Sequence, residues 1–350
     1  MLTELFLLTL TISLIVLFRW GFRTLPGERW QIIGCLLGNK QKDGAWKGLN
    51  LTYYGFFNAT AYLFAAVLFF ILMGSLSVPV SGTLAILTVI LTVCMPASKL
   101  IASWVEGKTN TFTVGGASFA GLIAAPWIIQ FINGTLGVRM GFQAPVMSVL
   151  AAITVAYAVG EGIGRLACIS FGCCYGKPLS ACHPVLRRIF LGRAFVFAGE
   201  TKKIAYAHHL DGQEVIPIQA VTALLLTGTG LLGCYGFLKG LPFTTFAGLI
   251  AVTQAWRALS EFFRADYRGT EKITTYQVMA LLSIVYAFLL LAFFPAAGGK
   301  IPDLKAGLIT LWNPGVILFF EILWGAAFLH TGRSRVTGAK IRLHVVEGKI

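Results

Sequence analysis

The fold is decided by apolar stretches such as residues 143–164, QAPVMSVLAAITVAYAVGEGIG. Only Glu161 in this stretch carries a formal charge, and Arg165 follows directly after it. A helix of roughly 20 apolar residues crosses the hydrocarbon core of a bilayer, which is about 30 Å thick. The stretch therefore predicts a membrane-spanning helix with a charged end.

Similar apolar stretches lie on both sides of this one, and two longer polar connections separate them. The further predicted spans are residues 2–20, 53–77, 83–104, 111–132, 216–238, 243–264, 273–297 and 307–329. The polar connections are residues 21–52 and 165–215, and the second is long enough to hold short helices or strands at the membrane surface. We predict an all-α polytopic membrane protein of about 8–9 transmembrane helices with a small polar head segment, residues 165–215.

The composition of the whole chain agrees with this prediction. The 350 residues are 57% hydrophobic and 12% charged, whereas soluble domains are about 25% charged. This excess of apolar residues excludes a water-soluble or disordered protein and requires contact with lipid. The first apolar run has Glu4 before it and Arg19 after it, which predicts a retained helix rather than a cleaved signal peptide.

The net charge of +14 comes from 28 Lys and Arg against 14 Asp and Glu. In a membrane protein this excess indicates cytoplasmic loops and anionic lipid headgroups, so we expect no nucleic-acid partner. With nine spans, the basic segments fall on one side of the membrane, which is predicted to be cytoplasmic, with the N-terminus outside. These segments are Arg19 to Lys47, Lys177 to Lys203, Arg264 to Lys272, and Arg333 to Lys349.

Two clusters of charged residues lie within or beside the spans, where charges are costly and commonly functional. The first runs from Glu161 through Arg165 into the glycine- and cysteine-rich turn 172–176, GCCYG. Glycines within the spans, such as Gly160 and Gly162, predict close approach between helices.

The second cluster contains Arg257, Glu261 and Arg264, spaced by four and three residues. On a helix this spacing places all three on one face. Guanidinium groups bind phosphate through paired, charge-assisted hydrogen bonds. The cluster thus predicts an anionic ligand held by arginines with a carboxylate partner, or alternatively a structural ion-pair stripe at the membrane interface.

Together these motifs resemble those of the prolipoprotein diacylglyceryl transferase family. The resemblance runs in family order over roughly residues 53–295. It rests on Tyr53-Tyr54-Gly55, Gly164-Arg165-Leu166 with Gly172 and Gly176, Pro217-Ile218-Gln219, and Arg257, Glu261, Phe262, Arg264 and Asp266. It implies a transferase-like transmembrane core at 53–297 that includes the head segment. Residues 1–52 would add an N-terminal membrane helix and basic loop, and residues 298–350 an extra transmembrane helix and basic tail.

The resemblance also implies a reaction. Members of the family move the diacylglyceryl group of phosphatidylglycerol onto a cysteine thiol of an exported prolipoprotein, and glycerol phosphate is released. They need no metal or other cofactor, and they work in the bacterial cytoplasmic (inner) membrane. By resemblance Arg165 and Arg257 would be catalytic, because they would stabilise the departing phosphate. Glu261 would orient Arg257 or Arg264. The implied substrate-binding residues are Tyr54, Arg264, Gly172, Gly176 and Gln219.

The residues that handle the acceptor thiol differ from the family pattern. Ala120 stands where the family has the histidine favoured as base, and Cys168 and Cys173 replace an asparagine and a glutamate. Another group would then serve as base, or the acceptor is not a prolipoprotein cysteine. His208 and His209 of the head segment could supply the base.

Other interpretations stay open on the sequence alone. The spacing of Cys168, Cys173, Cys174, Cys182 and His183 fits no common zinc pattern, so no metal is expected. A thiol near Arg165 could have a lowered pKa and act as a nucleophile. The rival classes are a phospholipid-modifying enzyme with a different acceptor, a non-catalytic lipid-binding protein, and a transporter. No internal repeat of the kind common in transporters is evident.

Overall fold

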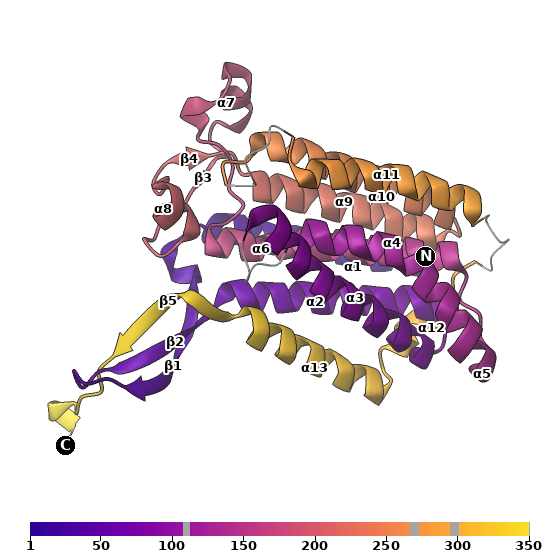
Figure 1. The fold of residues 1–350 in the computed structure, drawn as a ribbon, viewed down its shortest axis with the longest axis horizontal. Coiled ribbons are helices and arrows are strands. Elements are labelled where there is room, and N and C mark those ends of the chain that lie inside the picture. The colour runs from indigo at the N-terminus through magenta and orange to yellow at the C-terminus, as the bar shows by residue number, and fades with distance from the viewer. Residues whose placement is uncertain (108–112, 267–272, 295–300, 350) are drawn as a thin grey trace.

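The computed structural model describes residues 1–107, 113–266, 273–294 and 301–349. Within these ranges eight helices are long and apolar enough to cross a membrane. They are α1 (Leu2–Thr24), α2 (Tyr53–Ser75), α3 (Val80–Glu106), α4 (Val114–Ile132), α6 (Val146–Phe171), α9 (Ile218–Leu238), α11 (Thr275–Phe293) and α13 (Pro314–Thr331). A ninth long helix, α10 (Pro242–Ser260), lies among them and carries the polar Gln254 and Arg257 (Figure 1). The prediction of an all-α multi-pass membrane protein is confirmed.

Each predicted span overlaps one of these helices, but several ends differ. The span predicted at 307–329 is divided between the short helix α12 (Leu304–Thr310) and α13, which begins at Pro314. Helix α6 continues past Gly164 as far as Phe171. It ends there because Gly172 adopts a left-handed φ of 69°. Helix α10 stops at Ser260, and a short 3₁₀ turn, Glu261–Phe263, replaces the predicted last turn. Residues 111–112 and 295–297 of two predicted spans lie outside the described residues.

Shorter elements connect and cap the long helices. The helical ones are α5 (Val138–Met140), α7 (Pro184–Phe190), α8 (Lys203–His208), α12 (Leu304–Thr310), the π-helical turn Asn133–Gly137, and the 3₁₀ turns Glu28–Trp30, Leu179–Ala181 and Glu347–Lys349. The strands are β1 (Ile32–Lys40), β2 (Trp46–Thr52), β3 (Phe195–Val196), β4 (Glu214–Val215) and β5 (Arg333–Ile341). The predicted short helices and strands of the head segment are therefore present.

Helix α6 is the centre of the bundle and packs most extensively against α9 and α2. Its glycines allow this contact. A Cβ atom on Gly160 would lie 2.7 Å from the Ala65 Cβ, and one on Gly162 would overlap the Thr227 hydroxyl. The predicted close approach of helices at these glycines is confirmed.

The polar segments gather at one end of the bundle, opposite the N-terminus (Figure 1). The head segment lies there, together with a three-stranded antiparallel sheet of order β1-β2-β5. In this sheet the C-terminal tail pairs with the N-terminal loop, as in Trp46 with Ile341. The predicted grouping of the basic segments on one side is thus seen for the described residues, while 267–272 lie outside them. The identity of the membrane face stays a prediction.

Lys202 ties the head segment to the end of α6 and is completely buried. Its Nζ donates to the carbonyl oxygens of Ser170, at 2.6 Å, and of Leu25, at 3.2 Å. A side chain at Gly172 would be strained, because φ is 69° there and a Cβ atom would lie 3.0 Å from the Lys202 Cβ. The lysine therefore fixes the turn that carries the cysteine-rich motif.

We expect Lys202 to make stability depend on pH. Burial lowers the pKa of Lys202 from 10.5 to about 8, against a smaller opposing effect of Glu28. Between these two values the unfolded chain keeps a proton that the folded chain has released. The free energy of unfolding should therefore rise with pH over this interval, by about 3 kcal/mol in all. Thermal unfolding in detergent from pH 7 to 10.5 would measure the rise. Lys202→Met should remove it, and Lys42→Met, at an exposed lysine, should not.

Candidate functional site

The two arginine motifs meet at the polar end of the bundle. Gly176 and Arg264 form an isolated antiparallel bridge. The Lys177 amide donates to the Phe263 carbonyl at 2.9 Å, and the Ala265 amide donates to the Tyr175 carbonyl at 3.1 Å. Backbone hydrogen bonds thus join the turn after α6 to the segment after α10.

Glu161 is the carboxylate that links the two catalytic candidates. It accepts a short hydrogen bond from Arg165, one turn further along α6, and a 2.7 Å bond from Arg257 on α10. Arg257 also donates to the Tyr157 hydroxyl. The Glu161 side chain is only 5% exposed, against 13% for Arg165 and 15% for Arg257. One carboxylate therefore holds two buried guanidinium groups, which leaves a formal charge of +1.

Both arginines retain unused hydrogen-bonding capacity. The Nε atoms of Arg165 and Arg257 are buried and have no hydrogen-bond partner among the described residues. Buried donors of this kind usually have a partner in native proteins. The cluster therefore offers two N–H donors and one excess positive charge to an anion.

Glu261 was predicted to orient Arg257 or Arg264, and the structure places it beside Arg264, while Arg257 pairs with Glu161. The prediction that Glu261, Arg264 and Arg257 share one face of a helix is wrong from Glu261 onward. Helix α10 ends at Ser260, and the backbone at Arg264 is extended where it bridges to Gly176. Arg264 instead binds Asp266 through two bonds of 2.8 and 2.9 Å. Glu261 lies 3.9 Å from Arg264, and its Oε2 is buried without a partner in the described chain. Two carboxylates near one arginine leave a charge of −1, so Arg264 is less suited to an anion than Arg165 and Arg257.

The other predicted substrate-binding residues surround the turn after α6. Tyr54, in the first turn of α2, packs against Phe171 with ring centroids 5.4 Å apart. Gly172 forms the left-handed cap, and Gly176 is in contact with the backbone of Ile216. Gln219 donates from Nε2 to the Cys173 carbonyl at 2.9 Å. All four lie at the cysteine-rich turn, where they shape or line the site.

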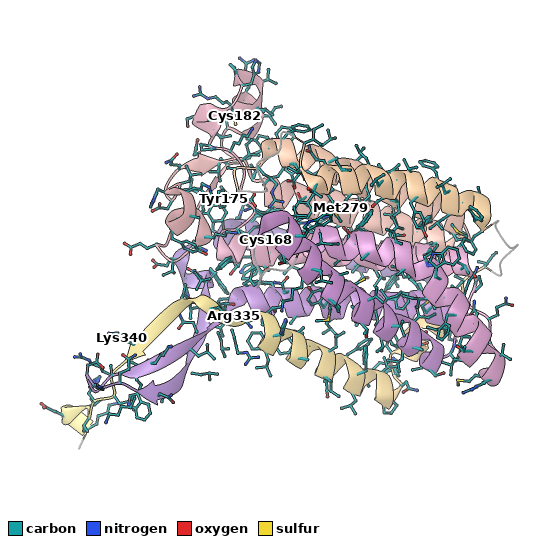
Figure 2. The ribbon with its side chains drawn as sticks, viewed as in Figure 1. Cys168, Tyr175, Cys182, Met279, Arg335 and Lys340 are labelled. Atoms are coloured by element: carbon teal, nitrogen blue, oxygen red, sulfur yellow. The ribbon has the colours of Figure 1, made fainter. Side chains whose placement is uncertain are left out.

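Three of the five candidate metal ligands come together and two do not. The Sγ atoms of Cys168, Cys173 and Cys174 all lie within 4.8 Å of one another. Cys182 lies toward the tip of the head segment, away from Cys168 and Tyr175 (Figure 2), and its thiol donates to the Pro178 carbonyl. His183 begins α7 and accepts from the Val185 amide, 3.4 Å from its Nδ1.

The three thiols lie close to the cationic groups of the site. Arg165 interacts electrostatically with Cys168 and Cys174, and Tyr54 interacts with all three cysteines. Hydrogen bonds with the neighbouring thiols and burial raise the pKa of Cys173 well above its usual value. This raised pKa disfavours Cys173 as the low-pKa nucleophile near Arg165 that the sequence left open.

A tyrosine–histidine pair forms the edge of the site toward the head segment. The Tyr175 side chain is completely buried, and its hydroxyl makes a short hydrogen bond with the Nδ1 atom of His208 at the end of α8. Burial and the nearby Asp266 raise the pKa of Tyr175. Of the two histidines weighed as a base, His208 thus contacts the site.

Sequence reasoning missed Tyr157 and Gly115, and it did not predict that Glu161 pairs with Arg257. Tyr157, Glu161 and Arg165 are spaced by four, so a search for polar residues along one face of the span would have grouped them. Gly115 of α4 had no such signal. It makes room for Arg257, because a Cβ atom there would lie 3.0 Å from the arginine Nη1.

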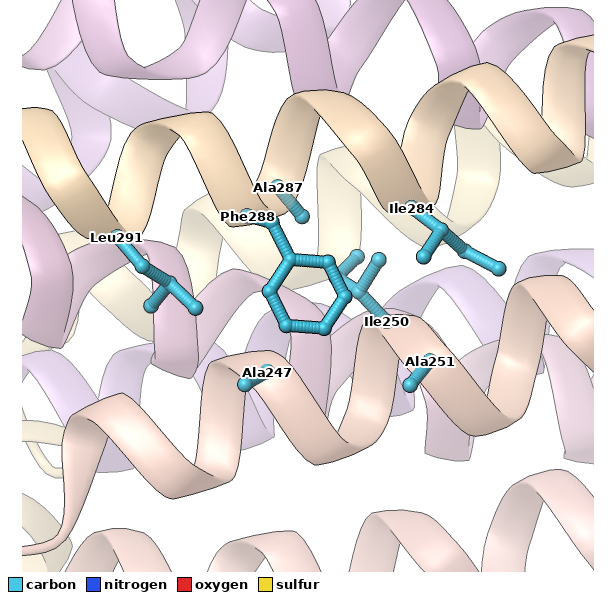
Figure 3. A pocket seen from close by; sticks show the side chains of 7 residues that line it. All are labelled: Ala247, Ile250, Ala251, Ile284, Ala287, Phe288 and Leu291. Atoms are coloured by element: carbon cyan, nitrogen blue, oxygen red, sulfur yellow. The ribbon is translucent and has the colours of Figure 1, made fainter.

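An apolar hollow between α10 and α11 lies apart from this chemistry (Figure 3). It is lined by Ala247, Ile250, Ala251, Ile284, Ala287, Phe288 and Leu291. These side chains offer no donor or acceptor to a polar headgroup, so the hollow belongs to helix packing.

In sequence comparisons, neither a family model nor a curated protein matches this chain.

Proposed function

We propose that the chain is a membrane enzyme that transfers the diacylglyceryl group of phosphatidylglycerol to an acceptor. One observation carries the proposal, namely the convergence of Arg165 and Arg257 on the single carboxylate of Glu161. The resulting charge of +1 and the two unused Nε donors suit a phosphodiester, which is a single anion with oxygen acceptors.

The arginines would act on the leaving group. A thiol of the acceptor would attack the glyceryl carbon next to the phosphate. A carbon–sulfur bond would form, the carbon–oxygen bond would break, and the thiol proton would pass to a base. The bond electrons would leave with glycerol phosphate, whose added negative charge Arg165 and Arg257 would stabilise. Such preorganised donors contribute most where water is excluded, and both arginine side chains are nearly buried.

The remaining residues of the site have supporting roles in this proposal. Tyr54 and the glycines at 172 and 176 would shape the headgroup pocket, while Gln219 would hold the turn through the Cys173 carbonyl. His208, through Tyr175, is the favoured base in place of the histidine that Ala120 replaces. The acceptor would be a prolipoprotein cysteine, in lipoprotein biosynthesis at the bacterial inner membrane, or a different nucleophile.

The decisive test uses purified protein in phosphatidylglycerol vesicles with a cysteine-containing lipoprotein peptide. Glycerol phosphate release and the peptide mass should both report turnover. Arg165→Ala and Arg257→Ala should each lower it by about 100-fold or more. Arg139→Ala, at an exposed arginine of α5, should not.

Other outcomes of this assay separate the rival functions. Glycerol phosphate without a lipidated peptide would indicate another acceptor or hydrolysis. Phospholipid binding without either product would indicate a lipid-binding protein. Solute flux across the vesicle membrane, again without products, would indicate a transporter. Either of the last two results would overturn the transferase proposal.

A further inference from the structure

The cysteine cluster is a second chemical feature of the polar end, and the proposed transfer does not use it. Its members come from the last turn of α6 (Cys168) and from the turn directly after it (Cys173 and Cys174). Thiols are soft ligands that select zinc, copper(I) and similar ions. We infer that Cys168, Cys173 and Cys174 form a three-thiolate site for a single Zn²⁺ ion.

The distances between the sulfur atoms fit such an ion. A Zn–S bond is about 2.3 Å, so two ligands of a tetrahedral zinc lie about 3.8 Å apart. The three Sγ atoms already lie within 4.8 Å of one another. Shifts of about 1 Å or less, within the reach of side-chain rotation, would bring them to the zinc distance.

The backbone is built to bring these side chains together. Gly172 reverses the chain with a φ of 69°, and the Cys173 amide donates to the Cys168 carbonyl at 3.0 Å. Cys174 also adopts a left-handed φ, of 56°, which is uncommon for a residue with a side chain and often marks a functional position. A single turn of α6 and its cap therefore supply all three ligands.

Neighbouring side chains hold the ligands in place, as is usual around metal ions. Gln219 binds the Cys173 carbonyl at 2.9 Å, and Lys202 binds the Ser170 carbonyl at 2.6 Å. These bonds fix the turn from both sides. The site is thus supported whether or not a ligand is present.

Charge favours Zn²⁺ over a monovalent soft ion. Three thiolates and Zn²⁺ sum to −1, whereas the same thiolates with copper(I) would sum to −2. Zinc therefore leaves the smaller negative charge to be buried beside Arg165. Three protein ligands also leave the fourth position of zinc open to water or to a thiol.

The spacing C-x₄-C-C matches no common zinc pattern, so a sequence search for such patterns does not find this site. The spacing is unusual because all three ligands come from one helix end.

The test measures metal directly, so it does not depend on turnover. Protein purified in detergent without a histidine tag should contain one zinc per chain by elemental mass spectrometry. Cobalt(II) substitution should give intense sulfur-to-cobalt charge-transfer bands and the d–d bands of tetrahedral coordination. Competition with a chromophoric chelator should show that Cys168→Ser, Cys173→Ser and Cys174→Ser each weaken zinc binding at least tenfold.

Two cysteines outside the trio provide the control variants. Cys94→Ser and Cys234→Ser, on α3 and α9, should keep wild-type affinity. Arg257→Ala should lose turnover yet retain zinc, so failure of this site and failure of the proposed transfer are distinguishable. The cobalt spectrum of the wild-type protein decides the matter even if a serine variant does not fold. The inference would be overturned by any of four results. These are absence of zinc binding, zinc retained by the triple serine variant, copper(I) as the bound ion, and a disulfide within the trio.

Discussion

Replacing Glu161 with alanine is expected to lower the free energy of unfolding by about 3–5 kcal/mol and to abolish turnover. The substitution would leave Arg165 and Arg257 buried at 13% and 15% exposure without their shared carboxylate. A buried charge that loses its partner keeps the full cost of its desolvation. The effect should exceed that of removing either arginine, since each arginine variant still leaves one complete ion pair.

Glu161→Gln separates the charge from the shape of the side chain. The amide can still accept a hydrogen bond, but the cluster would carry +2 instead of +1. A second substitution, Arg257→Met in the Glu161→Gln background, removes one uncompensated cation. If the carboxylate acts by pairing, the double variant should be more stable than Glu161→Gln alone, and a double-mutant cycle would give the coupling energy.

Unfolding in detergent, by heat or by increasing fractions of a denaturing detergent, would measure these differences. Glu321→Ala is the matched control, because it removes an exposed carboxylate from the spanning helix α13. It should change the unfolding free energy by no more than about 0.5 kcal/mol. A Glu161→Ala variant as stable as this control would show that the two arginines do not depend on the carboxylate.

The spanning helices could be predicted from the sequence because their signal is local. Roughly 20 consecutive apolar residues suffice, and α2 or α9 could be located from composition alone. Helix ends depended on contacts that are not local. Helix α6 continues to Phe171 because the head segment covers its last turn, where Lys202 binds the Ser170 carbonyl.

The candidate site could be predicted only in part. Spacing and resemblance led to Arg165 and Arg257, and the structure brings both to one place. The partner of Arg257 could not be found this way, because Glu161 lies on another helix almost 100 residues earlier. Glu261 was the nearest carboxylate along the chain, but the strand-like bridge of Arg264 to Gly176 ends the helix between them. Likewise the pairing of β5 with β2 joins segments from opposite ends of the sequence.

Gly176→Ala is expected to reduce turnover by about 100-fold while the helical bundle stays folded. A Cβ atom at this position would overlap the Ile216 carbonyl oxygen and lie 2.7 Å from the Ile216 Cβ. The clashing carbonyl oxygen belongs to the backbone of Ile216. It cannot rotate away, because the Ile216 amide donates a hydrogen bond to the Lys177 carbonyl at 3.0 Å. The turn would therefore move away from Ile216, and its bridge to Arg264 would be lost.

This movement separates the two arginine motifs, which is why the expected loss falls on turnover. A misplacement of about 1 Å in a catalytic group can cost about 100-fold in rate. Overpacking at one buried position costs only about 1–3 kcal/mol of stability, so most of the protein should still fold. Glycerol phosphate release and thermal unfolding, measured on the same preparation, would show the two effects side by side. Gly248→Ala on α10, where a Cβ atom meets nothing within 4 Å, is the matched control and should leave both unchanged. Turnover of Gly176→Ala within twofold of wild type would mean that the bridge between the motifs does not position the arginines.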